Sequence, residues 1–135
     1  NYIRNSKDLK EAILENLYQS EKILSKPGIE IVLHSCNTGL ETDSKKRPIA
    51  QKLSKEMPNA IIKAPNGYLR IDLKGKENVY DENWEKRGKD NSWNIYFRGY
   101  KVSPADVESI IQYLTEEEKK KNEPENPNKD ETGNH

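Results

Sequence analysis

A histidine and a cysteine lie two residues apart in the segment His34-Ser35-Cys36-Asn37-Thr38-Gly39. A thiol can act as a nucleophile when a base takes its proton and hydrogen-bond donors hold the oxyanion that forms. Residues two apart on an extended chain point to the same face, so the His34 ring can touch the Cys36 thiol if the strand stays regular as far as Cys36. The segment therefore offers Cys36 as a candidate nucleophile and His34 as its candidate base.

The residues around the thiol are candidates for binding substrate and the oxyanion: Ser35, Asn37, Thr38 and Gly39. Backbone N–H groups just after a strand can face outward, and Thr38-Gly39 predicts a flexible turn. A second interpretation stays open, because a free cysteine is commonly a small buried apolar residue. A histidine at a strand end is likewise often only hydrogen-bonded.

The residues before the thiol predict the element that positions it. The apolar, β-branched run 29–34 is typical of a central strand buried on both faces. An amphipathic helix is expected from Pro48 to Met57, and a second apolar strand at 60–64. A strand, helix and strand in this order predict two parallel strands joined by a right-handed crossover. Reactive groups collect beyond the carboxyl ends of such strands, where Cys36 would lie.

The rest of the chain predicts further elements around this unit. We expect a helix over 6–26, strands at 68–73 and 93–98, and a charged excursion over 74–91 between them. Ser103, followed by proline and by an acid at the third position, predicts the start of a last helix. The pattern predicts a mixed, mainly parallel α/β sheet with helices on both faces.

Composition limits the domain organisation and the chemistry. Residues 115–135 contain no apolar residue, so we expect one folded domain over 1–114 and a charged flexible tail over 115–135. No apolar run approaches the roughly 20 residues of a membrane-spanning helix. One cysteine and two histidines make a His/Cys-rich metal site unexpected, and we predict no metal and no cofactor.

Three stretches together resemble a known group of domains: 32–39, 49–56 and 61–67. They are similar to the C-terminal modules of bacterial polymorphic toxins of the Rhs and filamentous-haemagglutinin types, and the aromatic strand 93–99 resembles a later strand of those modules. The strand that leads into the cysteine turn also resembles the nucleophile strand of caspase-like cysteine peptidases, including the CHAT subgroup.

This resemblance implies a caspase-like fold and a cysteine peptidase in which the Cys36 thiolate attacks a peptide carbonyl. The histidine of those peptidases is followed by glycine and precedes the cysteine by a strand and a helix. This chain has no His-Gly pair, so the resemblance places the histidine strand upstream of Asn1, and the sheet is expected to lack an N-terminal strand.

The resemblance also implies a setting and partners. We expect a secreted bacterial effector that acts in the cytoplasm of the target cell on a protein substrate. Its partner would be a cognate immunity protein or a complementing N-terminal fragment. Two alternatives stay open. One is a catalytically inactive partner-binding module of the same fold, and the other is a nucleic-acid-directed toxin that uses the basic residues 45–47, Lys52, Lys55 and Lys63. The zero formal net charge argues against nucleic-acid binding.

Overall fold

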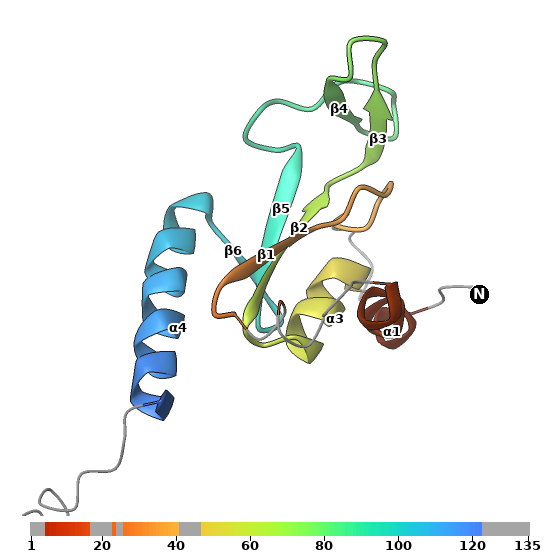
Figure 1. The fold of residues 1–135 in the computed structure, drawn as a ribbon. Helices are drawn as coiled ribbons and strands as arrows, with labels where there is room; N and C mark the ends of the chain where they lie inside the picture. Colours follow the sequence, from red (N-terminus) through yellow and green to blue (C-terminus); the bar gives the residue numbers. More distant parts are fainter. Residues whose placement is uncertain (1–4, 17–22, 24–25, 41–46, 123–135) are drawn as a thin grey trace, which may run out of the picture.

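A computed structural model describes residues 5–16, 23, 26–40 and 47–122 (Figure 1). The strands of this part of the chain form a four-stranded sheet and a separate two-stranded sheet. The larger sheet has the order β1-β2-β5-β6, with β1 at Ile29–Val32, β2 at Ala60–Pro65, β5 at Trp93–Phe97 and β6 at Tyr100–Val102. The smaller sheet is an antiparallel hairpin of β3 (Tyr68–Ile71) and β4 (Glu77–Tyr80).

The expectation of a mainly parallel, caspase-like sheet is wrong. Only β1 and β2 are parallel, whereas β2–β5 and β5–β6 are antiparallel. The helix α3 (Ile49–Glu56) makes the predicted crossover between β1 and β2. The chain then reverses without a second crossover helix, because the β3–β4 excursion returns it alongside β2. Arg98 and Gly99 form a two-residue turn with φ values of 50° and 86°, which suits an antiparallel hairpin between β5 and β6.

The strand β1 lies at the edge of the sheet, not at its centre as predicted. It pairs with β2 on one side, and no other described strand pairs with it. Ile29, Ile31 and Leu33 pack against the core and are only partly buried, while Glu30 is exposed. The apolar residues of β1 therefore pack on the core with one face of the strand, while the other face is only partly buried.

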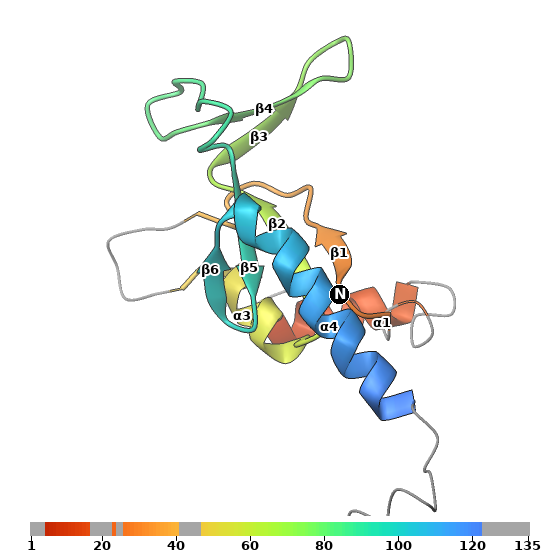
Figure 2. The same ribbon diagram turned by 90° about the vertical axis from the view of Figure 1, so that its left-hand side faces the viewer.

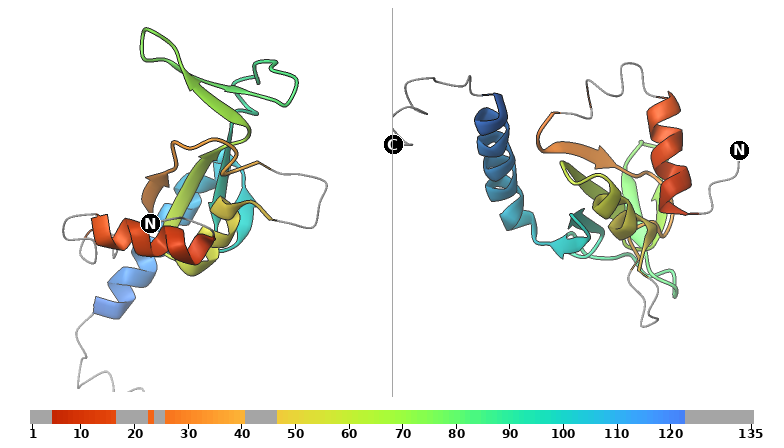
Figure 3. Two further views of the ribbon diagram at one scale, coloured as in Figure 1. Left: turned by 90° about the vertical axis from the view of Figure 1, so that its right-hand side faces the viewer. Right: turned by 90° about the horizontal axis from the view of Figure 1, so that it is seen from below.

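The core lies between α3 and the sheet. Helix α1 (Ser6–Asn16) packs against α3 on this side, and α4 (Val107–Asn122) covers the opposite face (Figures 2 and 3). Helices therefore cover both faces, although the sheet between them is mostly antiparallel. The buried cluster contains Ala50, Leu53 and Met57 from α3 and its end, Ala60, Ile62 and Ala64 from β2, and Tyr96 from β5.

Local hydrogen bonds explain where the helices begin. The Asn5 side chain accepts the backbone N–H of Asp8 at 2.8 Å, which caps α1. Of the predicted helix 6–26, residues 17–22 and 24–25 lie outside the described residues. The predicted start at Ser103 is confirmed, since Ser103 and Asp106 form a capping box.

The charged segment that follows Leu114 continues α4 as far as Asn122, and residues 123–135 lie outside the described part. No described helix is long and apolar enough to cross a membrane.

The β3–β4 hairpin projects from the end of the larger sheet, beyond the last residues of β2 (Figures 1 and 2). Successive residues of a strand point to opposite faces. Tyr68 and its partner Tyr80 share one face with Trp84, which stacks on Tyr68 with ring centroids 5.0 Å apart. The buried Val79 and Glu77 share the other face. This second face meets the residues that follow β1.

Candidate functional site

The His34 ring is held by a carboxylate that lies far from it in the sequence. Its Nδ1 lies 2.6 Å from Oε2 of Glu77, in β4. An ionised carboxylate only accepts hydrogen bonds, so Nδ1 carries the hydrogen and donates it. The ring also lies edge-on to Trp93, with centroids 5.9 Å apart. The side chain stays 55% exposed, and Nε2 has no hydrogen-bond partner among the described residues. Nε2 is therefore the ring atom that can take a proton.

The Cys36 thiol is exposed and does not close the core. Its Sγ accepts the backbone N–H of Leu69 at 3.4 Å and donates to the carbonyl oxygen of Leu69 at 3.6 Å. No hydrogen bond joins the thiol to His34, although both groups are described. The chain bends at Ser35 and turns over 36–39, so the alternation of an extended strand does not continue to Cys36. Both side chains instead lie against the same hairpin.

The predicted oxyanion donors divide into two groups. The N–H groups of Asn37 and Gly39 already donate to the carbonyl oxygens of Gly67 and Pro65, at 2.7 and 3.0 Å. The Thr38 hydroxyl donates to the Ser35 carbonyl oxygen at 2.9 Å.

The N–H groups of Ser35, Cys36 and Thr38 have no partner within the described part of the chain. The donors left for an oxyanion are therefore these three amides, of which the N–H of Cys36 was not predicted.

The loop that carries the thiol is hydrogen-bonded to the sheet at Gly39. The carbonyl oxygen of Gly39 accepts two hydrogen bonds of 2.9 Å, from the Asn94 amide and from the Tyr96 hydroxyl, both buried. A Cβ at Gly39 would lie 2.7 Å from the carbonyl oxygen of Ala64. Glycine is therefore needed for close approach to β2, and the backbone around the thiol is held in one conformation.

Glu77 and Trp93 are site residues that the sequence did not reveal. Glu77 lies 43 residues from His34, and only the hairpin brings them together. Trp93 lies beside both His34 and Lys63, and the Nζ of Lys63 is 5.5 Å from the indole centroid. No short motif contains these residues, so no spacing signal was available.

Other carboxylates of the hairpin region have structural roles. Asp72 Oδ1 accepts the backbone N–H groups of Lys74 and Lys76, each at 2.9 Å. Asp81 Oδ1 does the same for two amides of the next loop. No group of three or more His, Cys, Asp or Glu side chains in the described residues is arranged to hold a metal ion.

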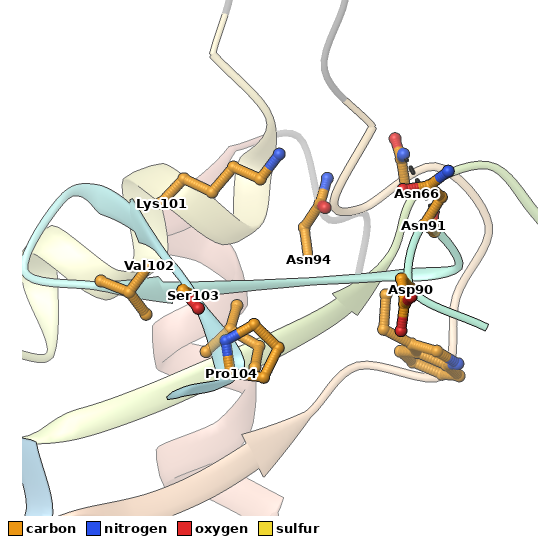
Figure 4. A pocket seen from close by; sticks show the side chains of 10 residues that line it. Asn66, Asp90, Asn91, Asn94, Lys101, Val102, Ser103 and Pro104 are labelled. Carbon is orange, nitrogen blue, oxygen red and sulfur yellow. Dashed lines mark hydrogen bonds between the residues drawn. The ribbon is translucent and has the colours of Figure 1, made fainter. Parts of the chain in front are cut away.

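A polar pocket of about 310 Å³ is lined in part by Trp93 (Figure 4). The amide side chains of Asn66, Asn91 and Asn94 line it, together with Ser103 and Pro104 before α4. The candidate nucleophile and base do not line this pocket. Of the basic residues proposed for nucleic acid, Lys63 lies beside Trp93, Lys52 and Lys55 are exposed on α3, and Arg47 precedes α3. Residues 45 and 46 are outside the described part.

Comparison with known proteins gives a family but no activity. Residues 2–79, more than half of the chain, match a family described as a domain of unknown function (DUF8616). The chain belongs to this family. The part matched to DUF8616 contains His34, Cys36 and Glu77, whereas Trp93 lies beyond it. No curated protein and no solved structure matches the chain.

Proposed function

We propose that this DUF8616 chain is a cysteine-dependent hydrolase of acyl bonds, with Cys36 as nucleophile and His34 as general base. The observation that carries the proposal is the 2.6 Å contact between His34 Nδ1 and Glu77 Oε2. A carboxylate on Nδ1 fixes the tautomer and the ring orientation, and it stabilises the imidazolium that forms during acyl transfer. The exposed thiol lies two residues further along the same loop.

The proposed reaction begins with transfer of the thiol proton to His34 Nε2. This requires Sγ to leave Leu69, and the two sulfur hydrogen bonds, at 3.4 and 3.6 Å, are of a weak kind. The thiolate attacks the carbonyl carbon, and the N–H groups of Ser35 and Cys36 donate to the oxyanion. Imidazolium then returns the proton to the leaving group. Water, deprotonated by His34, hydrolyses the resulting thioester and regenerates the thiol.

The resemblance of the Ser-Cys-Asn-Thr-Gly segment to polymorphic toxin modules supplies the proposed setting. In that setting the chain is an effector delivered by bacteria, a protein in the target-cell cytoplasm is the substrate, and an immunity protein covers the surface around Cys36. Because the sheet is not that of caspase-like peptidases, the chemistry rests on the site and not on the fold.

A generic acyl donor tests the chemistry directly. p-Nitrophenyl acetate should acetylate Cys36 and release nitrophenolate in a burst that matches the enzyme concentration, with the acetyl group located by mass spectrometry. Cys36→Ala should abolish the burst. His34→Gln should slow acetylation of Cys36 by about a hundredfold or more, the scale of a lost general base.

The matched control is Glu82→Gln, because Glu82 is exposed and has no hydrogen bond or ion pair with His34 or Glu77. It should react like the unmodified chain. Equal acetylation rates in His34→Gln and the control would show an ordinary surface thiol and overturn the proposal. Growth of a bacterial host that expresses the chain, compared with Cys36→Ala at matched soluble levels, tests the effector role.

An inactive partner-binding module is the second candidate, and one observation favours it. The thiol is bonded to the backbone of Leu69 and not to His34. In that case Cys36 only holds the loop against the hairpin. The acetylation experiment distinguishes the two candidates, because His34 does not raise the acetylation rate of a thiol with a purely structural role.

A further inference from the structure

Four basic side chains surround a second pocket, on the side of Trp93 that faces the hairpin. The pocket has a volume of about 390 Å³ and is lined by Lys76, Lys86, Arg87 and Lys89. Trp93 and Glu77 also line it, so it directly adjoins the carboxylate that holds His34. A ligand group in this pocket would therefore lie beside the proposed general base.

The positive charge of this pocket is not neutralised by the protein. No carboxylate of the described residues lies within ion-pair distance, 4.0 Å, of the four cationic groups. The one carboxylate in the lining, that of Glu77, is engaged by His34. Like charges that line one pocket repel each other and attract a counter-ion. The pocket lining therefore has an excess of positive charge, which favours binding of an anion.

The Arg87 side chain gives independent support, because its guanidinium has no hydrogen-bond partner among the described residues. Its Nε is buried near Gly67, which does not line the pocket, so the two terminal nitrogens are the donors left for a ligand there. A guanidinium presents several N–H donors in a fixed plane and binds oxyanions through two of them at once. Its position beside three lysines suits a compact group with several acceptor oxygens.

We propose that the pocket between β4 and the residues before β5 binds a compact oxyanion on the ligand of this domain, phosphate in preference to carboxylate. Phosphate offers more charge and more acceptor oxygens to four cations than a carboxylate does. The assignment of this anion to the substrate of the Cys36 site rests on the proposed function; binding of the anion itself does not.

Trp93 allows the binding to be measured without any reaction. The chain has two tryptophans, so Trp84→Phe leaves Trp93 as the only indole. In this background we expect sodium phosphate to change the indole emission saturably. Sodium acetate at the same ionic strength should bind more weakly, and sodium chloride should give no saturable change. Lys86→Gln with Lys89→Gln should raise the dissociation constant for phosphate at least about tenfold.

The control replaces Lys119 and Lys120, which are exposed on α4, with glutamine and should leave phosphate binding unchanged. The proposal is overturned by equal phosphate binding in the two double variants, by the absence of saturation, or by acetate binding as tightly as phosphate. Cys36→Ala should bind phosphate normally. Loss of acetylation in that variant with intact phosphate binding separates the two proposals.

Discussion

The backbone of Leu69 holds the Cys36 thiol from two sides, with its N–H 3.4 Å and its carbonyl oxygen 3.6 Å from Sγ. The thiol thus occupies the place of a neighbouring strand residue beside β3. His34 contacts the same hairpin through Glu77, at the start of β4. The hairpin therefore positions both candidate catalytic side chains, although neither belongs to it.

Replacing Glu77 with glutamine should separate catalysis from stability. Glutamine keeps the size of the side chain, but its amide can hold the wrong tautomer of His34. We expect Cys36 acetylation to slow by at most the factor lost in His34→Gln, about a hundredfold, because Glu77 acts only through His34. The free energy of unfolding should fall by less than about 1 kcal/mol, because His34 and Glu77 are both partly exposed.

Urea unfolding and acetylation of the same preparations measure the two effects. The exposed Glu82→Gln variant again serves as control. An acetylation rate for Glu77→Gln equal to that of the control would show that the carboxylate does not act through His34.

Replacing Tyr96 with phenylalanine should loosen the loop that carries the thiol. The hydroxyl donates to the Gly39 carbonyl oxygen at 2.9 Å in a fully buried position. Asn94 still donates to the same oxygen, so the acceptor is not left without a partner. We expect a loss of about 1 kcal/mol of unfolding free energy, measured by urea denaturation. Replacing Tyr113 with phenylalanine, at an exposed site on α4, should change it by less than about 0.5 kcal/mol.

The sequence predicted best the elements whose signals are local. The crossover from β1 through α3 to β2 follows from two apolar runs around one amphipathic segment, and it is confirmed. The capping box at Ser103 is confirmed because its two partners lie three residues apart. The helix α1 begins at Ser6, as predicted.

Strand direction and sheet order depend on contacts that no local pattern carries. The polar β4 sequence Glu-Asn-Val-Tyr has only one buried residue, Val79, so its strand pattern is weak. The three residues of β6 follow an Arg-Gly turn in which arginine itself has a positive φ, a conformation that favours Asn or Gly. Without β4 and β6, a parallel sheet was the simplest continuation of the first crossover.

In the site, as in the fold, the sequence predicted what is local and missed what depends on distant contacts. Cys36 and His34 were selected because they stand close together in the sequence. Their partners, Leu69 and Glu77, are 33 and 43 residues away and are brought to them by the hairpin. The condition for a contact between thiol and imidazole, a regular strand as far as Cys36, is not met, because the chain bends at Ser35. Residue alternation does not predict this bend.

Removing the Ser54 hydroxyl should destabilise the turn between β5 and β6. Ser54 is fully buried in α3, and its Oγ accepts the backbone N–H of Gly99 at 2.9 Å. In Ser54→Ala this amide loses its partner in a buried position, at an expected cost of about 1–3 kcal/mol. Ser109→Ala, at an exposed position of α4, is the control in the same thermal or urea unfolding experiment. Equal stabilities would mean that water replaces the hydroxyl.

The final prediction concerns Gly39, where the loop of the thiol meets β2. An alanine Cβ would lie 2.7 Å from the carbonyl oxygen and 2.9 Å from the Cβ of Ala64, which is buried in the core. Neither atom can move without displacing β2, so we expect Gly39→Ala to lower the unfolding free energy by about 1–3 kcal/mol.

The matched control is Gly88→Ala, because nothing lies within 4 Å of a Cβ there. It should be within about 0.5 kcal/mol of the unmodified chain. If Gly39→Ala is the less stable of the two and also acetylates Cys36 more slowly, packing against β2 sets the position of the thiol. If Gly39→Ala is as stable as the control, the loop can move away from β2, and the rigidity inferred for the site is wrong.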